Sequence, residues 1–561
     1  MAEFERRYGD RLPEVRGDFT PYWEDGAASS ARETALARNA SERLVQAETL
    51  WALLDPAHFP DADFYTAWRN VILYNEHTWG AYCSITKPDS QLTRDQWKIK
   101  QAFALDADRQ SRELLRRATA RRRGSNKPVT AVDVYNTCSW PRDDVIVLPK
   151  GMARPGDTVQ TPDGRPVPSQ RLADGRLAFL ARSVPPLGAK RFVLKAGAAR
   201  PAGQAKARGR RLTTSALEVE VDGDTGAIER LVWKPAGIDF AGGAQRRGLN
   251  TYHYVPSRDP KTAQSLTGGV TVRVEDAGPL VASLVVESPA PGCRKLTRRL
   301  CVVDGLPFVF ITNVVDKKPV RTPESVHFGF DVNVPDGVMR LDIPWAIIRP
   351  EKDQLPGACK NYFSVGRWID VTNRTVGLTC AVVDAPLAEV GAIRVDVSKP
   401  LEPSAWLKHL DPTQTFFSYV MNNYWETNYK ADQEGPTVFR YALQPHGPFD
   451  PAQCVKFGIE RSQPLVVVPA NPDVPVRGSA VRVEPASVIV TSLKPSRDGR
   501  ALIVRLRNVS DQPVQARLSW LDPKPASLAI CDPFEEPAAP VTGFVQLAPK
   551  GIVTLRAELT K

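Results

Sequence analysis

Residues 132–148, with the sequence V-D-V-Y-N-T-C-S-W-P-R-D-D-V-I-V-L, lie where the pattern of the chain changes. Apolar side chains here alternate with polar ones or form short runs bounded by proline, which is typical of β-strands. Before residue 125, apolar side chains recur every three or four positions, which is typical of helices. We therefore expect helices before residue 125 and strands after it.

Residues 31–124 predict three helices. The first has an apolar stripe from Leu36 to Leu54, preceded by the capping-box motif Ser30-Ala31-Arg32-Glu33. The second is expected over residues 61–83. The third begins at the motif Thr93-Arg94-Asp95-Gln96 and ends in an arginine-rich segment. Three helices with short connections predict a small antiparallel bundle.

The rest of the chain predicts β-sheet. Proline accounts for 49 of the 561 residues, which suits strands joined by turns better than helices. The fold class is therefore multidomain: a three-helix bundle followed by predominantly antiparallel β-sandwich domains. Segments 195–211 and 464–477 are expected linkers, so the expected domains are 31–124, 131–194, 212–463 and 478–561. Strands are expected at 132–135, 145–148, 217–221, 270–274, 306–315, 481–483, 488–491, 501–506 and 553–559.

Composition excludes several functions. The net charge of +11 is spread over 561 residues, and the basic runs at 116–123 and 206–211 lack interleaved aromatics, so we expect no nucleic-acid partner. No stretch reaches the roughly 20 apolar residues of a membrane span, and the first residues lack the apolar core of a signal peptide. As written, the chain is expected to be cytoplasmic and not to bind membranes. Its oligomeric state stays open.

The eight cysteines never form a Cys-x-x-Cys pair, which makes a zinc ribbon or a thioredoxin-type site unlikely. Buried, reduced thiols are the default expectation, although an even number leaves disulfides open. The six histidines form neither His-x-His nor His-Glu-x-x-His. Spacing alone therefore does not indicate an enzyme.

Three short segments nevertheless carry residue types that suit a sugar site. Residues 17–26 hold three carboxylates and three aromatic rings, including Trp23 and Asp25; the alternative is an ordinary loop before a helix. Residues 74–81 contain His77, which could equally be a core or surface histidine. Residues 422–428, ending at Asn428, offer amides and aromatics for hydroxyls and ring faces, and a structural turn is the alternative.

At these segments the chain resembles the C-terminal part of glycoside hydrolase family 38, the α-mannosidases, in a bacterial-type version. Residues 17–26 resemble the end of the family's catalytic domain, and residues 76–80 its late zinc-ligand histidine. Residues 136–142 resemble the family's Asn-x-x-Ser-Trp-Pro-Arg motif. Residues 217–228 resemble the start of its large β-sandwich, and residues 493–556 its closing β-domain. The resemblance covers nearly the whole chain in the family's order.

The resemblance implies a retaining glycosidase that acts on α-mannosides, with Zn²⁺ as cofactor and carbohydrate as partner. His77 would be one of four zinc ligands, and residues 1–30 would be the remnant of the catalytic α/β domain. Trp23 and Asp25 would line the substrate side, together with Asn428. The catalytic carboxylates and the other zinc ligands lie upstream in the family, so this chain alone is expected to be inactive. The alternative is a β-sandwich protein that binds carbohydrate without cleaving it; a nucleic-acid binder is weaker still.

Overall fold

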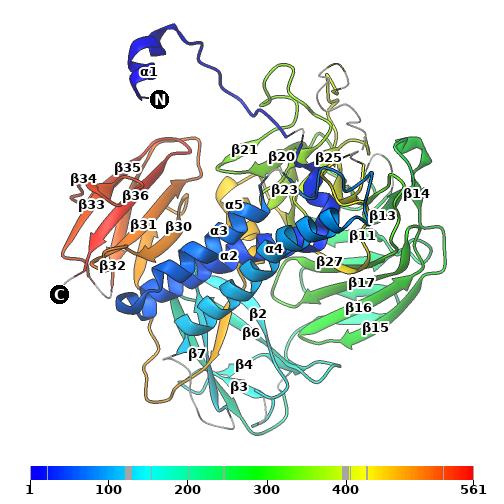
Figure 1. Cartoon of the computed structure of the whole chain (residues 1–561). Helices are drawn as coiled ribbons and strands as arrows, with labels where there is room; N and C mark the ends of the chain where they lie inside the picture. Colours follow the sequence, from blue (N-terminus) through cyan, green and yellow to red (C-terminus); the bar gives the residue numbers. More distant parts are fainter. Residues whose placement is uncertain are drawn as a thin grey trace.

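The computed structural model describes residues 2–21, 23–76, 78–120, 129–152, 155–199, 201–243, 245, 247–394, 404, 406–424, 427–521 and 524–559. Its first elements are helical, and α1 stands away from the body of the molecule on an extended arm (Figure 1). These elements are α1 (Ala2–Tyr8), η1 (Gly9–Arg11), η2 (Glu24–Ser30), α2 (Ala31–Leu54), η3 (Pro56–His58), α3 (Asp61–Tyr74) and α4 (Gln91–Ala118).

Helices α2, α3 and α4 pack on one another through small and aromatic side chains. Leu44, Trp51 and Phe64 share one buried cluster with Leu114 of α4. The apolar stripe seen in the sequence is therefore the face that α2 buries. The second helix is shorter than expected and ends at Tyr74, where Asn75 donates to the carbonyl of Val71 over 2.8 Å.

The helix starts also differ from the capping motifs. The Ser30 hydroxyl does not cap α2; the backbone N–H of Ala31 instead donates to the side chain of Gln433, 402 residues away in the sequence. Glu33 accepts from Gln101 rather than capping. For α4 the N-cap is Ser90, whose hydroxyl accepts from the N–H of Thr93. Tertiary partners therefore replace the local cap of α2.

The first β region contains one five-stranded and one three-stranded antiparallel sheet. The five-stranded sheet takes its edge strand β28 from far along the chain, since Val132 pairs with Pro469. The bounds are β1 (Ala131–Asn136), β2 (Arg142–Leu148), β3 (Thr158–Gln160), β4 (Pro166–Val167), β5 (Ser169–Arg171), β6 (Leu177–Val184), β7 (Gly188–Lys195) and β28 (Val466–Pro469).

An eleven-stranded sheet forms one layer of the large sandwich. Its order is β22-β25-β26-β19-β13-β11-β10-β9-β8, with β12 and β14 attached to β11 and β13. The bounds are β8 (Lys206–Arg208), β9 (Arg211–Thr213), β10 (Leu217–Val221), β11 (Ile228–Trp233), β12 (Ile238–Asp239), β13 (Leu249–Val255), β14 (Gln264–Ser265), β19 (Ser325–Asp331), β22 (Phe363–Ser364), β25 (Leu387–Val390) and β26 (Thr415–Asn422), and η5 (Pro260–Thr262) lies between β13 and β14.

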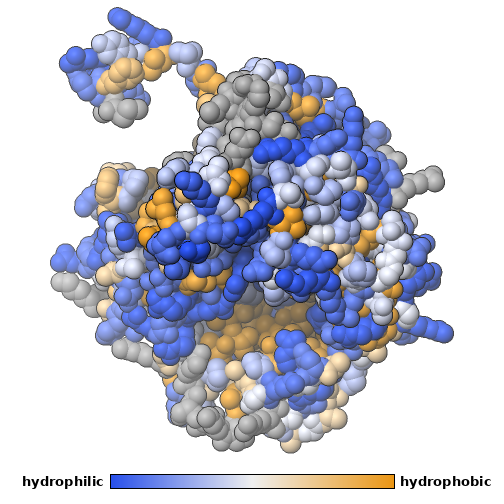
Figure 2. Space-filling view, turned by 45° about the vertical axis from the view of Figure 1, so that its right-hand side comes forward, coloured by the Kyte–Doolittle hydropathy of each residue, from blue (hydrophilic) through white to orange (hydrophobic). Residues whose placement is uncertain are grey.

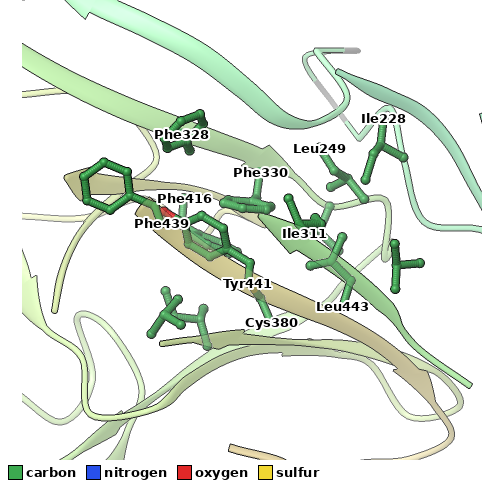
Figure 3. Packing of buried hydrophobic residues seen from close by; sticks show 14 of the residues in the cluster. Ile228, Leu249, Ile311, Phe328, Phe330, Cys380, Phe416, Phe439, Tyr441 and Leu443 are labelled. Atoms are coloured by element: carbon green, nitrogen blue, oxygen red, sulfur yellow. The ribbon is translucent and has the colours of Figure 1, made fainter. Parts of the chain in front are cut away.

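A nine-stranded sheet forms the other layer, and the two share the largest apolar cluster, part of which Figure 3 shows. Phe330 and Phe416 stack with centroids 4.9 Å apart in this core. The bounds are β15 (Thr271–Ala277), β16 (Val281–Ser288), β17 (Cys293–Val303), β18 (Val309–Lys317), β20 (Val338–Ile343), β21 (Ala346–Ile348), β23 (Trp368–Thr372), β24 (Gly377–Val382) and β27 (Gly435–His446).

The C-terminal region is a smaller sandwich with its own core, formed by a three-stranded and a five-stranded sheet. The bounds are β29 (Val481–Glu484), β30 (Val488–Pro495), β31 (Ala501–Asn508), β32 (Val514–Trp520), β33 (Ser527–Cys531), β34 (Pro537–Pro540), β35 (Phe544–Leu547) and β36 (Ile552–Glu558). Every expected strand segment overlaps one of these or of the preceding strands.

One helix interrupts the β region and was not expected. Helix α5 (Pro451–Ser462) follows β27, and its N-cap Asp450 accepts from the N–H of Ala452 over 2.8 Å. Proline at the first helical position after an aspartate is a helix-start signal that the strand-rich surroundings obscured. The expectation of almost only strand after residue 125 is corrected here, while the fold class of helices followed by antiparallel β-sheet is confirmed.

The structure also bears on the cysteines and on membrane-spanning helices. All eight cysteines are free and buried, in agreement with reduced thiols. Among the described helices, none is both long and apolar enough to cross a membrane.

Glu48 on α2 should make stability depend on pH. Only 8% of this residue is exposed, and its carboxyl accepts a 2.8 Å hydrogen bond from Trp68. Burial raises the pKa of Glu48 to about 7. Since the folded pKa exceeds the unfolded one, the contribution to stability is complete below pH 4.5 and is lost as the pH rises through about 7.

Glu48→Gln is therefore expected to stabilise the protein by up to about 3 kcal/mol at pH 8 and to change little at pH 4. Denaturant unfolding at both pH values measures this difference. Glu14→Gln, on the exposed N-terminal arm, is the matched control. An equal effect of Glu48→Gln on stability at both pH values would contradict a raised pKa for Glu48 in the folded protein.

Candidate functional site

Three segments that are distant in the sequence meet around one buried tyrosine. They are residues 18–30, the loop between α3 and α4, and the segment that follows β26. Tyr429 is fully buried, and its ring lies edge-on to that of Trp79 at 5.9 Å between centroids. Gly26 fills the remaining space, since a Cβ there would lie 2.3 Å from the Trp79 ring and 2.6 Å from the Tyr429 ring. We call this arrangement the Tyr429 junction.

Asp25 lies inside the junction and is 2% exposed. Its carboxylate accepts a 2.5 Å hydrogen bond from the Tyr429 hydroxyl, and its backbone N–H donates to the Tyr362 hydroxyl over 3.2 Å. Asn422 donates to the Asp25 carbonyl over 2.8 Å. Burial first, and then the Asp25 charge, raise the pKa values of Tyr429 and Tyr362 well above the usual range, so both hydroxyls keep their protons. The carboxyl group is thus held rigidly.

Trp23 and Asn428 flank Asp25 and Tyr429 along the chain, and both are half-buried. The Trp23 carbonyl accepts from the Tyr429 hydroxyl at 2.6 Å. The Asn428 side-chain oxygen is buried and has no hydrogen-bond partner among the described residues. The structure therefore brings the three residues proposed from sequence to one place, although they come from two segments about 400 positions apart.

The loop between α3 and α4 is fastened to the same junction. Ser84 donates to the carbonyls of Thr427, at 3.0 Å, and of Tyr429. The Thr427 hydroxyl donates to the carbonyl of Tyr82 over 2.7 Å. Gly80 allows this approach, because a Cβ there would lie 3.0 Å from the Tyr429 carbonyl group.

His77 itself lies outside the described residues. Its neighbour Glu76 is exposed, and Thr78 is half-buried and donates to the Glu76 carboxylate over 3.3 Å. Around the junction the described carboxylate closest to the tyrosines is Asp25, which their hydroxyls already engage. A zinc site needs three or four protein ligands. The described residues of the junction do not form a complete one.

A different group of potential metal ligands lies in the nine-stranded sheet and α5. It comprises Asp370, His446 and Cys454, all buried, and it is the one such triad found among the described residues. His446 Nε2 lies 2.8 Å from Asp370 Oδ2, and His446 Nδ1 lies 2.9 Å from the Gly447 carbonyl. Asp370 also accepts from the Thr379 hydroxyl over 2.9 Å, so hydrogen bonds connect members of this group to one another and to the surrounding sheet. No spacing in the sequence signals it.

Exposed apolar side chains gather on α3, on α4 and on the loop between them. Tyr65 and Ile72 on α3 are 70% and 66% exposed, and Leu92 and Ile99 on α4 are 45% and 62% exposed. Each pair is seven positions apart, which places its members on one face of the helix. Tyr82, 71% exposed, adds to them from the loop. Most of the face in Figure 2 is hydrophilic. A group of exposed apolar side chains on such a surface is typical of an interaction site.

Comparison with known proteins identifies the C-terminal region. Residues 487–555 match the model of the glycosyl hydrolases family 38 C-terminal beta sandwich domain. This C-terminal region is similar to a family 38 domain. In the structure the matched residues comprise β30 to β36, the part that the sequence resemblance placed last.

Solved structures extend the likeness in fold to the rest of the chain. An α-mannosidase from Enterococcus faecalis V583 is 14% identical and superposes with a TM-score of 0.74, covering 100% of this chain and 72% of its own. A family 38 glycosyl hydrolase from Enterococcus faecalis is 15% identical, with a TM-score of 0.75 and coverage of 99% and 73%. No curated protein matches. The resemblance to the C-terminal portion of family 38 is thus confirmed.

Sequence reasoning missed the two tyrosines that hold the junction together. Tyr362, Asn422 and Tyr429 all contact Asp25. Asn422 belongs to the segment singled out as a sugar contact, whereas Tyr362 stands alone in the sequence and Tyr429 lies just beyond that segment. The only signal was the aromatic and amide content of residues 422–428, which ends one position before Tyr429.

Proposed function

We propose that this chain is the C-terminal part of a retaining α-mannosidase and contributes one wall of its active site without supplying the catalytic carboxylates. The observation that supports this most is the Tyr429 junction. It joins the segment that resembles the end of the catalytic domain, the loop that contains His77, and the segment that ends at Asn428. A mannoside site assembled from these segments would need all three held together.

In this proposal the junction positions groups rather than reacting itself. Tyr429 and Tyr362 fix the Asp25 carboxyl group, and the neighbouring Trp23 offers an aromatic ring for the C–H face of a sugar. The unpaired Asn428 oxygen can accept from a sugar hydroxyl, which would satisfy a buried acceptor. Together these residues would orient the mannoside and exclude water from one side of it.

The chemistry is assigned to groups outside this chain. Retaining hydrolysis needs a nucleophilic carboxylate and an acid–base carboxylate about 5–5.5 Å apart. In the described junction Asp25 is buried and engaged by the tyrosines, whereas Glu24 and Glu76 are exposed. A zinc ion, when bound with His77 as one ligand, would bind sugar hydroxyls and stabilise charge. Its other ligands are proposed to come from an α/β catalytic domain.

The exposed apolar side chains indicate where that domain docks. Tyr82 and Leu92 lie on the loop that carries His77 and at the start of α4, next to the junction. On the N-terminal arm, Phe4, Leu12 and Phe19 are 51%, 53% and 73% exposed. A catalytic domain seated over α3, α4 and the arm would cover these side chains and bring its zinc ligands to His77.

The test is hydrolysis of an aryl α-mannoside by the chain extended N-terminally with the sequence that precedes residue 1 in its gene. We expect turnover with retention, seen by nuclear magnetic resonance as α-mannose released first. An extended chain that binds mannose oligosaccharides without cleaving them would favour a carbohydrate-binding protein instead. An extension with no His-x-Asp pair would also contradict the proposal.

A further inference from the structure

A cavity of about 360 Å³ lies where α2, α5, the large sandwich and the C-terminal sandwich meet. Five arginine, aspartate and glutamate side chains line it: Arg38, Arg367, Arg507, Glu42 and Asp342. The three guanidinium groups outnumber the two carboxylates. The lining therefore carries an excess of positive charge, away from the Tyr429 junction.

Four of these five charges have partners within the chain. Glu42 accepts from Arg367 over 2.7 Å and from Gln463 over 2.8 Å. Asp342 accepts from the Arg367 backbone N–H over 2.8 Å. Arg38 donates to the Gly366 carbonyl over 2.6 Å. Both carboxylates thus form their hydrogen bonds with groups other than Arg507, although the Asp342 charge still acts on Arg507.

Arg507 is the exception. It is 5% exposed, and its Nε and Nη2 atoms are buried without a hydrogen-bond partner among the described residues. Burial lowers its pKa, and the Arg367 charge acts in the same direction, while the charge of Asp342 opposes them. Buried guanidinium N–H groups without a hydrogen-bond acceptor are nevertheless costly, so an acceptor bound in the cavity would stabilise them. Nε–H and Nη2–H form the edge of the guanidinium that binds carboxylate or phosphate through two parallel hydrogen bonds.

Trp345 stands beside this guanidinium. Its ring centroid lies 5.8 Å from Arg507 Cζ, and the residue is 48% exposed. Ile343 pairs with Ala346, so Pro344 and Trp345 form the tight turn between β20 and β21. Trp345 has a φ of 65°, a conformation that bulky residues rarely adopt and that is associated with functional positions. The turn therefore presents an aromatic face to the cavity.

We infer that this cavity binds a small molecule bearing a carboxylate or a phosphate group, which pairs with the Nε–Nη2 edge of Arg507 while Trp345 contacts the rest of the molecule. The volume lies in the lower range of small-molecule sites, about 300–1,000 Å³. Arg507 belongs to the C-terminal sandwich and Trp345 to the large sandwich. The ligand would therefore link the two sandwiches. The inference does not depend on the proposed function.

Calorimetric titration and thermal unfolding of the 561-residue chain test it at constant ionic strength. The probes are inorganic phosphate, acetate, mannose 6-phosphate and glucuronate, with mannose and chloride as references. We expect saturable one-to-one binding of a phosphate or carboxylate probe and a rise in melting temperature. Binding of the phosphates alone would assign a phosphate ligand, and binding of acetate and glucuronate alone a carboxylate.

Arg507→Met should weaken that binding at least 10-fold without lowering the melting temperature in the absence of anion, since buried N–H groups that lack an acceptor among the described residues are removed. Arg505→Met is the matched control on the same strand and should leave binding unchanged. Arg507→Lys keeps the charge but loses the pair of parallel N–H donors, so it should also weaken binding. This variant replaces the methionine variant if the latter does not fold. No saturable binding of any anionic probe, or equal binding by the Arg507 and Arg505 variants, would overturn the inference.

Discussion

Replacing Tyr429 by alanine is expected to lower the free energy of unfolding by about 3–5 kcal/mol, the usual cost of deleting a buried aromatic side chain. The ring fills the space between Trp79 and Gly26, and its hydroxyl bonds both the Asp25 carboxylate and the Trp23 carbonyl. Removing it would leave a cavity and take a 2.5 Å hydrogen bond from a buried carboxylate. Denaturant unfolding followed by tryptophan fluorescence measures the loss.

Two variants separate the ring from its hydroxyl. Tyr429→Phe keeps the packing and removes the hydrogen bonds, so it should cost less, about 1–3 kcal/mol. Tyr65→Ala, at a tyrosine that is 70% exposed, should change stability by less than about 0.5 kcal/mol. A loss below about 1 kcal/mol for Tyr429→Ala would show that the three segments do not depend on this residue.

The largest functional effect is expected from His77→Ala in the extended chain. Changes to residues that only contact a metal ligand lower metal affinity or activity about 10–100-fold, so loss of His77, the proposed zinc ligand, should lower kcat/KM by more than about 100-fold. Zinc content after gel filtration should fall in parallel. Steady-state kinetics with an aryl α-mannoside and metal analysis measure both.

His58→Ala is the matched control, because His58 is exposed on η3 and contacts Asp55. Asp25→Asn should raise KM more than it lowers kcat if the residue lines the site without reacting. Full activity and full zinc content in His77→Ala would remove His77 from the site.

The sequence predicted the elements much better than their contacts. Periodicity located three strand segments of the large sandwich, at 217–221, 270–274 and 306–315. The first buries alternate side chains, at Leu217, Val219 and Val221. Pairing is not local, so nothing indicated that β28 joins the sheet of β1 across more than 300 positions. The cap of α2 was wrong for the same reason, since Gln433 supplies it.

For the candidate site too, the sequence predicted residues but not their contacts. Trp23, Asp25 and Asn428 were found from their residue types, and the structure places them around one tyrosine. Their role in binding substrate stays a prediction. The tyrosines that bury Asp25 could not be predicted, because Tyr362 and Tyr429 lie more than 300 positions from Asp25. No local sequence pattern signals a contact over such a separation.

Turnover of an aryl α-mannoside by the 561-residue chain alone, with zinc added, tests the central claim most directly. The account predicts no measurable hydrolysis, because retaining catalysis needs two carboxylates, both are proposed to come from a catalytic domain outside this chain, and buried Asp25 is engaged by Tyr429. A robust rate that Asp25→Asn abolishes would contradict it. The catalytic carboxylates would then have to lie within this chain.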